Sequence, residues 1–82
     1  MTQIEWERVD NDRIDDATLA LLLLTLDDNG RAWKSFDWET MNRLHEKGFI
    51  SDPKGKQQSV ALTEEGQARA VALFQEMFVR SK

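Results

Sequence analysis

Apolar residues concentrate first in a stretch from Asp12 to Leu26, where leucines follow one another with few polar interruptions. In the second half of this stretch the leucines face nearly every side of a helix. The pattern therefore predicts either the central core helix or half of a subunit interface. Asn11 or Asp12 is placed to cap the start of this helix, and the polar run 27–30 is placed to end it.

Two further helices are predicted by apolar spacing and by capping residues. Asp37 is suited to cap the first of them, and Lys47 followed by Gly48 gives an ordinary C-terminal stop. Thr63 is suited to cap the second, which continues through Phe78. The apolar positions of the two helices are Trp38, Met41, Leu44 and His45 in the first, and Ala70, Val71, Phe74, Met77 and Phe78 in the second.

Alternating residues between these two helices predict a β-hairpin. Phe49 and Ile50 begin one strand, and the return strand runs from Gln58 to Leu62 with Val60 on the same face. The run 52–55 reads Asp-Pro-Lys-Gly, which suits a type I turn whose glycine takes a positive φ. The predicted class is therefore α+β and mostly helical, with three main helices and a two-stranded hairpin.

Two large aromatic residues lie within the segment 30–37 and a third follows it directly. This segment has room for little more than one helical turn. We expect Trp33, Phe36 and Trp38 to fill the core, because aromatic side chains supply much of the buried area of a small domain. The alternative is an exposed aromatic patch interleaved with basic residues, which would suit stacking on single-stranded bases.

The first ten residues place Ile4, Trp6 and Val9 among charges, a pattern compatible with a short strand, one helical turn or a frayed arm. With this segment, the 82 residues are expected to form a single domain spanning 1–82. A chain this short buries a small core, so a partner subunit would help to stabilise it.

Composition and charge exclude several classes of protein. The chain has no cysteine, which excludes disulfides and fits a reducing cytoplasm. The longest apolar run, 19–26, is too short to span a bilayer and follows acidic residues, so we expect a soluble protein without a membrane partner. The formal net charge is -4, yet residues 31–62 hold six bases and four acids, which makes this third the place to look for a nucleic-acid surface.

The sequence offers no catalytic set. His45 is the only histidine and has no second histidine or cysteine to share a metal, so we interpret it as a core-edge residue bonded to a neighbour. We interpret the acidic pairs Asp15, Asp16 and Asp27, Asp28 as capping and solvating groups. No glycine belongs to a phosphate-binding motif. We therefore expect a protein that is not an enzyme and that uses no metal or cofactor.

From Leu44 to Gly66, the residues LHEKGFI, a Pro-Gly hairpin and ALTEEG resemble the recognition-helix end, wing and final-helix start of bacterial winged-helix transcriptional regulators. The block RAWKSFDWETMNRLHEKGFI followed by SVALTEEG is similar to a family of small bacterial proteins catalogued only as a domain of unknown function. The winged-helix resemblance implies a winged-helix-like fold with duplex DNA as a partner, and the short segment before Asp37 indicates that the second helix of this fold is shortened. The second resemblance implies no activity.

In winged-helix regulators the helix before the wing enters the major groove, and the wing contacts phosphates or the minor groove. The resemblance therefore assigns the helix from Trp38 to the major groove and the hairpin tip to the wing. Glu39 and Glu46 share the outer face of that helix, where their charge opposes phosphate. The candidate nucleic-acid-binding residues, including two bases beside Trp33, are Arg31, Lys34, Asn42, Arg43, Lys47, Lys54, Lys56 and Gln57.

Two functions follow from these patterns. The first is a DNA-associated winged-helix regulator or accessory. The alternative is a protein-interaction or homodimerisation module that has lost nucleic-acid binding, which the overall acidity and the surplus apolar residues support. A homo-oligomer is compatible with both functions. The candidate dimer-interface residues are Leu19, Leu23, Leu73 and Val79.

Overall fold

The computed structural model describes residues 3–81, so Met1, Thr2 and Lys82 of the predicted domain lie outside the described residues. Within that range the predicted α+β, mostly helical class is confirmed, and the layout is compatible with a winged helix. The elements in order are the 3-10 turn η1 (Trp6–Arg8), α1 (Asn11–Leu21), the 3-10 segment η2 (Leu22–Thr25), β1 (Arg31–Trp33), α2 (Trp38–Glu46), β2 (Ser59–Ala61) and α3 (Glu64–Phe78).

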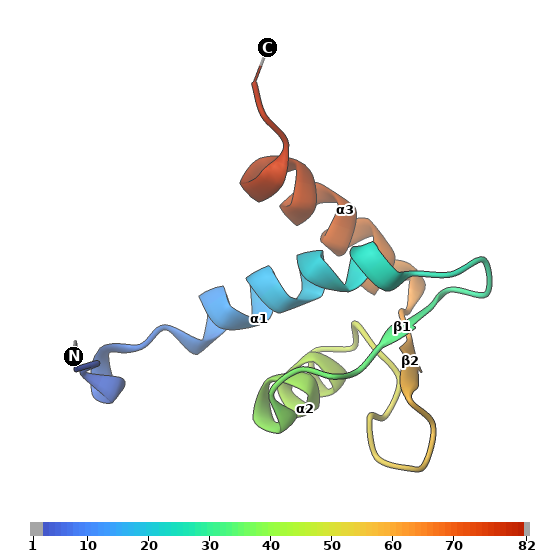
Figure 1. The fold of residues 1–82 in the computed structure, drawn as a ribbon, viewed down its shortest axis with the longest axis horizontal. Helices are drawn as coiled ribbons and strands as arrows, with labels where there is room; N and C mark the ends of the chain where they lie inside the picture. The colour runs from blue at the N-terminus through green and yellow to red at the C-terminus, as the bar shows by residue number, and fades with distance from the viewer. Residues whose placement is uncertain (1–2, 82) are drawn as a thin grey trace.

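Figure 1 shows α1 crossing α3, with α2 below α1 and the two strands beside the end of η2. Of the alternatives for the N-terminal segment, the described part forms one helical turn, η1, which projects away from the helices (Figure 1). None of the described helices has the length and hydrophobicity that crossing a bilayer requires.

The helix ends largely follow the predicted capping chemistry. The Asp37 carboxylate accepts the amide of Thr40 at 3.2 Å, and Gly48 stops α2 with a φ of +82. The cap of α1 was predicted one or two residues too late. Asp10 is the N-cap, because its carboxylate accepts the amides of Asp12 and Arg13.

The sheet differs from the predicted hairpin. β2 pairs antiparallel with β1, with Trp33 opposite Ser59, whereas residues 49–51 contribute a single bridge, Ile50 to Leu62. The segment predicted to hold a shortened second helix, 30–37, contains β1 instead. The extended form is held on both sides, since the amide of Trp33 donates to the Thr25 hydroxyl and the amide of Lys34 donates to the Gln58 carbonyl.

The leucine run is buried partly through a change of helical pitch. At Leu22 the chain passes from α1 to η2, and a 3-10 segment has about 3.0 residues per turn instead of about 3.6. Leu19 and Leu22 are fully buried, and Leu24 is exposed. The predicted dimer interface is wrong for Leu19 and Leu73, which lie in the core of the chain itself, and Leu23 packs partly against that core. Val79 is exposed, and its place in an interface stays a prediction.

The predicted core positions of α3 also need correction. Leu73 is buried, whereas Val71, Met77 and Phe78 are exposed. The C-terminal half of α3 extends beyond the other elements, so its apolar residues find little to pack against within residues 3–81 (Figure 1). The buried hydrophobic residues are Leu19, Ala20, Leu22, Ala32, Met41, Leu44, Ile50, Val60, Leu62, Ala70 and Leu73.

The expectation that aromatic rings fill the core is wrong for Trp33, Phe36 and Trp38, all of which are exposed. The strand alternation of β1 explains the first of them. Ala32 points into the core opposite Val60, so its neighbour Trp33 must point outward. Aliphatic side chains from the helices and from the paired extended segments already supply the core.

Candidate functional site

The loop between Ile50 and β2 has a defined conformation at residues 52–57, which we call the wing loop. The Asp52 carboxylate accepts the amide of Lys54 at 2.9 Å, and Pro53 is buried. Gly55 has a φ of +122, a conformation that side chains rarely adopt. The predicted type I turn over residues 52–55 is not closed by a backbone hydrogen bond. Lys54 and Lys56 stand exposed on either side of this glycine.

Two basic side chains from β1 and its end brace the wing loop. The Lys34 ammonium donates to the carbonyls of Pro53 at 2.7 Å and Gly55 at 3.0 Å. The Arg31 guanidinium donates to the Ser59 hydroxyl and carbonyl, each at 2.8 Å, and to the Gln57 side chain. These acceptors are all uncharged. The bonds therefore fix the position of both cations, and no salt bridge within residues 3–81 joins either of them to an acid.

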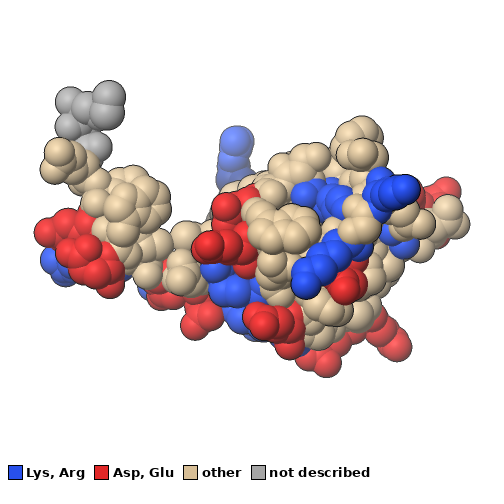
Figure 2. Space-filling model, turned by 90° about the horizontal axis from the view of Figure 1, so that it is seen from below, with Lys and Arg blue, Asp and Glu red and all other residues tan. Residues whose placement is uncertain are grey.

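The braced loop and the sheet edge enclose a hollow of about 400 Å³. Four bases and one acid, Asp52, line this hollow. A space-filling view from below shows basic side chains gathered on the side away from the N-terminal segment that contains η1 (Figure 2). We call this hollow the basic hollow. Its lining residues are Arg31, Lys34, Ser51, Asp52, Lys54, Gly55, Lys56, Gln57 and Ser59.

The structure thus brings together five of the predicted nucleic-acid-binding residues. Ser51 and Ser59 also line the basic hollow, and the sequence analysis did not single them out for this role. The available signal was strand alternation, because each serine follows or precedes a buried residue, Ile50 or Val60, and so faces outward.

Arg43 and Lys47, both predicted to contact DNA, instead turn toward α1. Arg43 Nε lies 2.9 and 3.0 Å from the two carboxylate oxygens of Asp15, and Lys47 Nζ lies 2.8 Å from one of them. Asp15 is only 1% exposed, so its interpretation as a solvated residue is wrong. We call Asp15, Arg43 and Lys47 the buried ion triad.

The electrostatics of the buried ion triad favour the charged forms. Burial acts to raise the pKa of Asp15, but hydrogen bonds and charge from Arg43 and Lys47 outweigh it and hold that pKa below its ordinary value. The hydrogen bond to Asp15 in turn raises the pKa of Arg43 and of Lys47. Both cations are therefore neutralised within the fold and contribute little to an outer basic surface.

The outer face of α2 is acidic. Glu39 and Glu46 are exposed there, and Asn42 lines a separate hollow of about 320 Å³ with Glu46, Asp52 and Lys54. His45 also lines it, and its Nδ1 lies 3.0 Å from the Ile50 carbonyl, so this nitrogen donates a hydrogen bond. The interpretation of His45 as bonded to a neighbour is confirmed.

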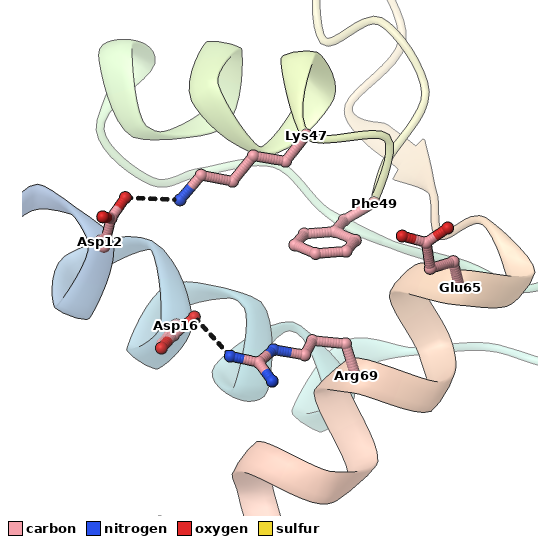
Figure 3. A pocket seen from close by; sticks show the side chains of 6 residues that line it. All are labelled: Asp12, Asp16, Lys47, Phe49, Glu65 and Arg69. Atoms are coloured by element: carbon pink, nitrogen blue, oxygen red, sulfur yellow. Dashed lines mark hydrogen bonds and ion pairs between the residues drawn. The ribbon is translucent and has the colours of Figure 1, made fainter.

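A third hollow, of about 540 Å³, lies where α1, the end of α2 and the start of α3 meet (Figure 3). Lys47 pairs with Asp12 at 2.9 Å, and Arg69 pairs with Asp16 at 3.7 Å. Figure 3 shows the Phe49 ring beside these pairs, between the end of α2 and the start of α3. Positive and negative groups nearly balance here, so we interpret the hollow as a seam of helix contacts.

Within residues 3–81, no group of three or more His, Cys, Asp or Glu side chains is arranged to hold a metal ion. The basic hollow, with its uncompensated charge, is therefore the surface that best defines a candidate site.

Fold and site together define a small α+β protein with a basic surface on a chain that is acidic overall. The chain belongs to the family described as "Domain of unknown function (DUF6429)", whose profile matches residues 10–80. It is similar to "Uncharacterized protein y4hR" of Sinorhizobium fredii (strain NBRC 101917 / NGR234), with 54% identity over 72 residues that cover 88% of this chain and 97% of that protein. No solved structure matches the chain. The resemblance to a family of unknown function is confirmed.

Proposed function

We propose that the chain is a winged-helix-like nucleic-acid-binding module that contacts phosphates through its wing loop and sheet edge. The basic hollow carries this proposal. Arg31 and Lys34 are held by uncharged acceptors, and Lys54 and Lys56 are exposed beside them. Fixed cations without counterions attract a polyanion and lose little side-chain freedom when it binds.

The acidity of α2 supports a contact made by the wing rather than by the helix. Arg43 and Lys47 pair with Asp15, and Lys47 also pairs with Asp12. Glu39 and Glu46 stand exposed on the outer face. A helix presenting these two carboxylates to the major groove would place them near phosphates, which costs binding free energy. Contacts limited to phosphates predict binding with little sequence preference.

Binding of mixed-sequence duplex DNA is expected to weaken steeply as salt is raised. Four phosphate contacts would give a slope of about −3.6 for log K against log salt. Replacing both Lys54 and Lys56 by Ala should reduce the steepness by up to about 2, because each lost contact removes about 0.9. Fluorescence anisotropy of a labelled duplex, titrated at several salt concentrations, measures both slopes.

Arg8 and Arg13 provide a matched control, since they are exposed and lie on η1 and α1, away from the basic hollow. The double replacement of Arg8 and Arg13 by Ala changes net charge by the same amount as the lysine pair. It should leave the slope nearly unchanged. If both double variants reduced the salt slope equally, binding at the wing would be contradicted. Unchanged anisotropy of the wild type at low salt would contradict it as well.

Self-association is a second candidate function, supported by the exposed apolar residues of α3. Phe78 is 48% exposed and its ring lies 5.4 Å from that of Phe74. Val71, Met77 and Val79 are also exposed on or just beyond this projecting half of the helix. A second copy of the chain could cover these residues with the same surface, as a two-fold dimer requires.

If this surface forms a homodimer, the Phe78→Glu variant should be monomeric at concentrations where the wild type is dimeric. The introduced carboxylate would have to be buried without a partner, which opposes association. Ala72→Glu is the control, because Ala72 is exposed on a different side of α3. Light scattering coupled to gel filtration gives the mass of each variant, and a monomeric wild type at high concentration would exclude this candidate.

A further inference from the structure

The outward face of the two-stranded sheet carries an exposed tryptophan beside the basic hollow. Ala32 and Val60 point into the core, so Arg31 and Trp33 lie on the opposite face of β1, two residues apart. Trp33 is 58% exposed, and its cross-strand partner is Ser59, a small residue that also lines the basic hollow. An aromatic ring and a set of cations therefore share one continuous surface.

We propose that this surface binds single-stranded polynucleotides, with a base stacked on Trp33 and the adjoining phosphates on Arg31 and the wing-loop lysines. The phosphate contacts rest on the function proposed above, and the stacking contact adds a preference for unpaired bases. Stacking requires an accessible base face, which a duplex keeps covered by its neighbouring base pairs.

Trp33 has short neighbours on β2, and the Arg31 guanidinium reaches across to Ser59, the residue opposite the ring. Ser59 opposite it and Ala61 further along β2 are short, so no tall side chain of β2 rises beside the ring. A large apolar ring kept mostly in water gains free energy when a base covers it. This gain does not depend on base identity, because every base has a π face.

The backbone that carries Trp33 is fixed before any ligand arrives. Its amide donates to the Thr25 hydroxyl at 3.0 Å, and the next amide, of Lys34, donates to the Gln58 carbonyl at 3.1 Å. Little backbone freedom is therefore lost on binding, which favours affinity.

The charge on this face complements a nucleotide chain. Arg31 lies about 7 Å from Trp33 along the strand, from two steps of about 3.4 Å each. Its guanidinium is bonded to neutral groups and keeps its charge for a phosphate. Trp38, by contrast, is 54% exposed on α2, beside the acidic Glu39. The third tryptophan, Trp6, is also exposed but stands between Glu5 and Glu7. Of the three tryptophans, Trp33 has the electrostatic surroundings that suit a polyanion.

The experiment measures anisotropy of labelled oligo(dT) and oligo(U) of about 15 nucleotides, and of a mixed-sequence duplex of equal length. Trp33→Ala should weaken binding of the single strands by about 5- to 100-fold and change duplex binding by less than about twofold. Trp33→Leu should behave like Trp33→Ala, whereas Trp33→Phe should retain most of the affinity, since stacking needs an aromatic face. Either polymer binding in this manner supports the proposal, and the tighter one identifies the preferred strand.

Trp38→Ala is the matched control and should bind single strands like the wild type, with circular dichroism confirming that each variant is folded. Equal losses in Trp33→Ala and Trp38→Ala, or equal losses in Trp33→Phe and Trp33→Leu, would overturn stacking at this site. A wild type that binds duplex but no single strand overturns this inference alone. A wild type that binds neither overturns the proposed function as well.

Discussion

Replacing Asp15 by Asn is expected to lower the free energy of unfolding by about 3 kcal/mol, because breaking a buried ion pair leaves Arg43 without its partner and Lys47 with only Asp12. Asp15 receives bonds from Arg43 and Lys47 across 28 and 32 residues, so it ties α1 to α2. The side chains of Arg43 and Lys47 are 25% and 33% exposed. Water can therefore partly rehydrate both cations, which keeps the loss of unfolding free energy small for a broken buried ion pair. Urea unfolding followed by circular dichroism gives the difference.

Asp16→Asn is the control, since it makes the same chemical change at the next position of α1. Asp16 is 28% exposed and lies 3.7 Å from an exposed arginine, Arg69, so its loss should cost less than about 1 kcal/mol. Similar losses for the two variants would show that the buried ion triad contributes no more than a surface pair.

The same triad predicts how stability depends on pH. The pKa of Asp15 is lowered in the folded state, so this carboxylate binds protons more weakly there than in the unfolded chain. Its stabilisation is therefore complete above the unfolded pKa of about 3.9 and is lost as pH falls through the lower folded value. The stability difference between wild type and Asp15→Asn should stay constant from neutral pH to about pH 5 and shrink below about pH 4.

Local signals predicted the helices well. Asp37, Thr63 and Gly48 act at the helix ends as expected, because capping depends on residues within one turn of each other. The strand pairing was harder to predict. Residues 49–51 and Arg31–Trp33 both offer extended chain to β2, and tertiary packing decides which of them forms the ladder.

Long-range contacts account for the wrong predictions about Asp15, Leu19 and Leu73. An aspartate in the first turns of a helix ordinarily caps it or faces water, and nothing near Asp15 in the sequence indicates that Arg43 will reach it. The two leucines were read as surplus to one apolar stripe. They are buried because α1 packs on α3 as well as on α2. These two contacts cover more of the circumference of α1 than a single apolar stripe would.

The candidate site was partly predictable. The turn residues placed Lys54 and Lys56 at an exposed loop, and the basic third of the chain contained every cation of the basic hollow. Periodicity on α2 put Arg43 on the outer side of the helix, but it could not show that a carboxylate from α1 would draw the side chain inward. The general tendency of aromatic side chains to be buried likewise gave a wrong prediction for Trp33. The face of the sheet on which Trp33 lies depends on the pairing register of β1.

Replacing Gly66 by Ala is expected to destabilise the fold by about 2–4 kcal/mol, although the same change in an open helix stabilises by about 1 kcal/mol. A Cβ on Gly66 would lie 1.9 Å from the Phe49 carbonyl oxygen and 2.8 Å from its carbon. These atoms are backbone and cannot rotate away. In thermal unfolding, the melting temperature should fall by about 4–8 °C for each kcal/mol of unfolding free energy lost.

The neighbouring bonds explain why the chain cannot relax around the added methyl group. Phe49 O accepts the amide of Thr63 at 2.9 Å, and the Thr63 hydroxyl both donates to Gly48 O at 2.7 Å and accepts the amide of Gly66 at 2.9 Å. Moving either backbone breaks the cap of α3 or its link to the end of α2. Gln75→Ala, on an exposed part of the same helix, should change stability by less than about 0.5 kcal/mol, and a Gly66→Ala protein as stable as this control would show that the close approach is not required.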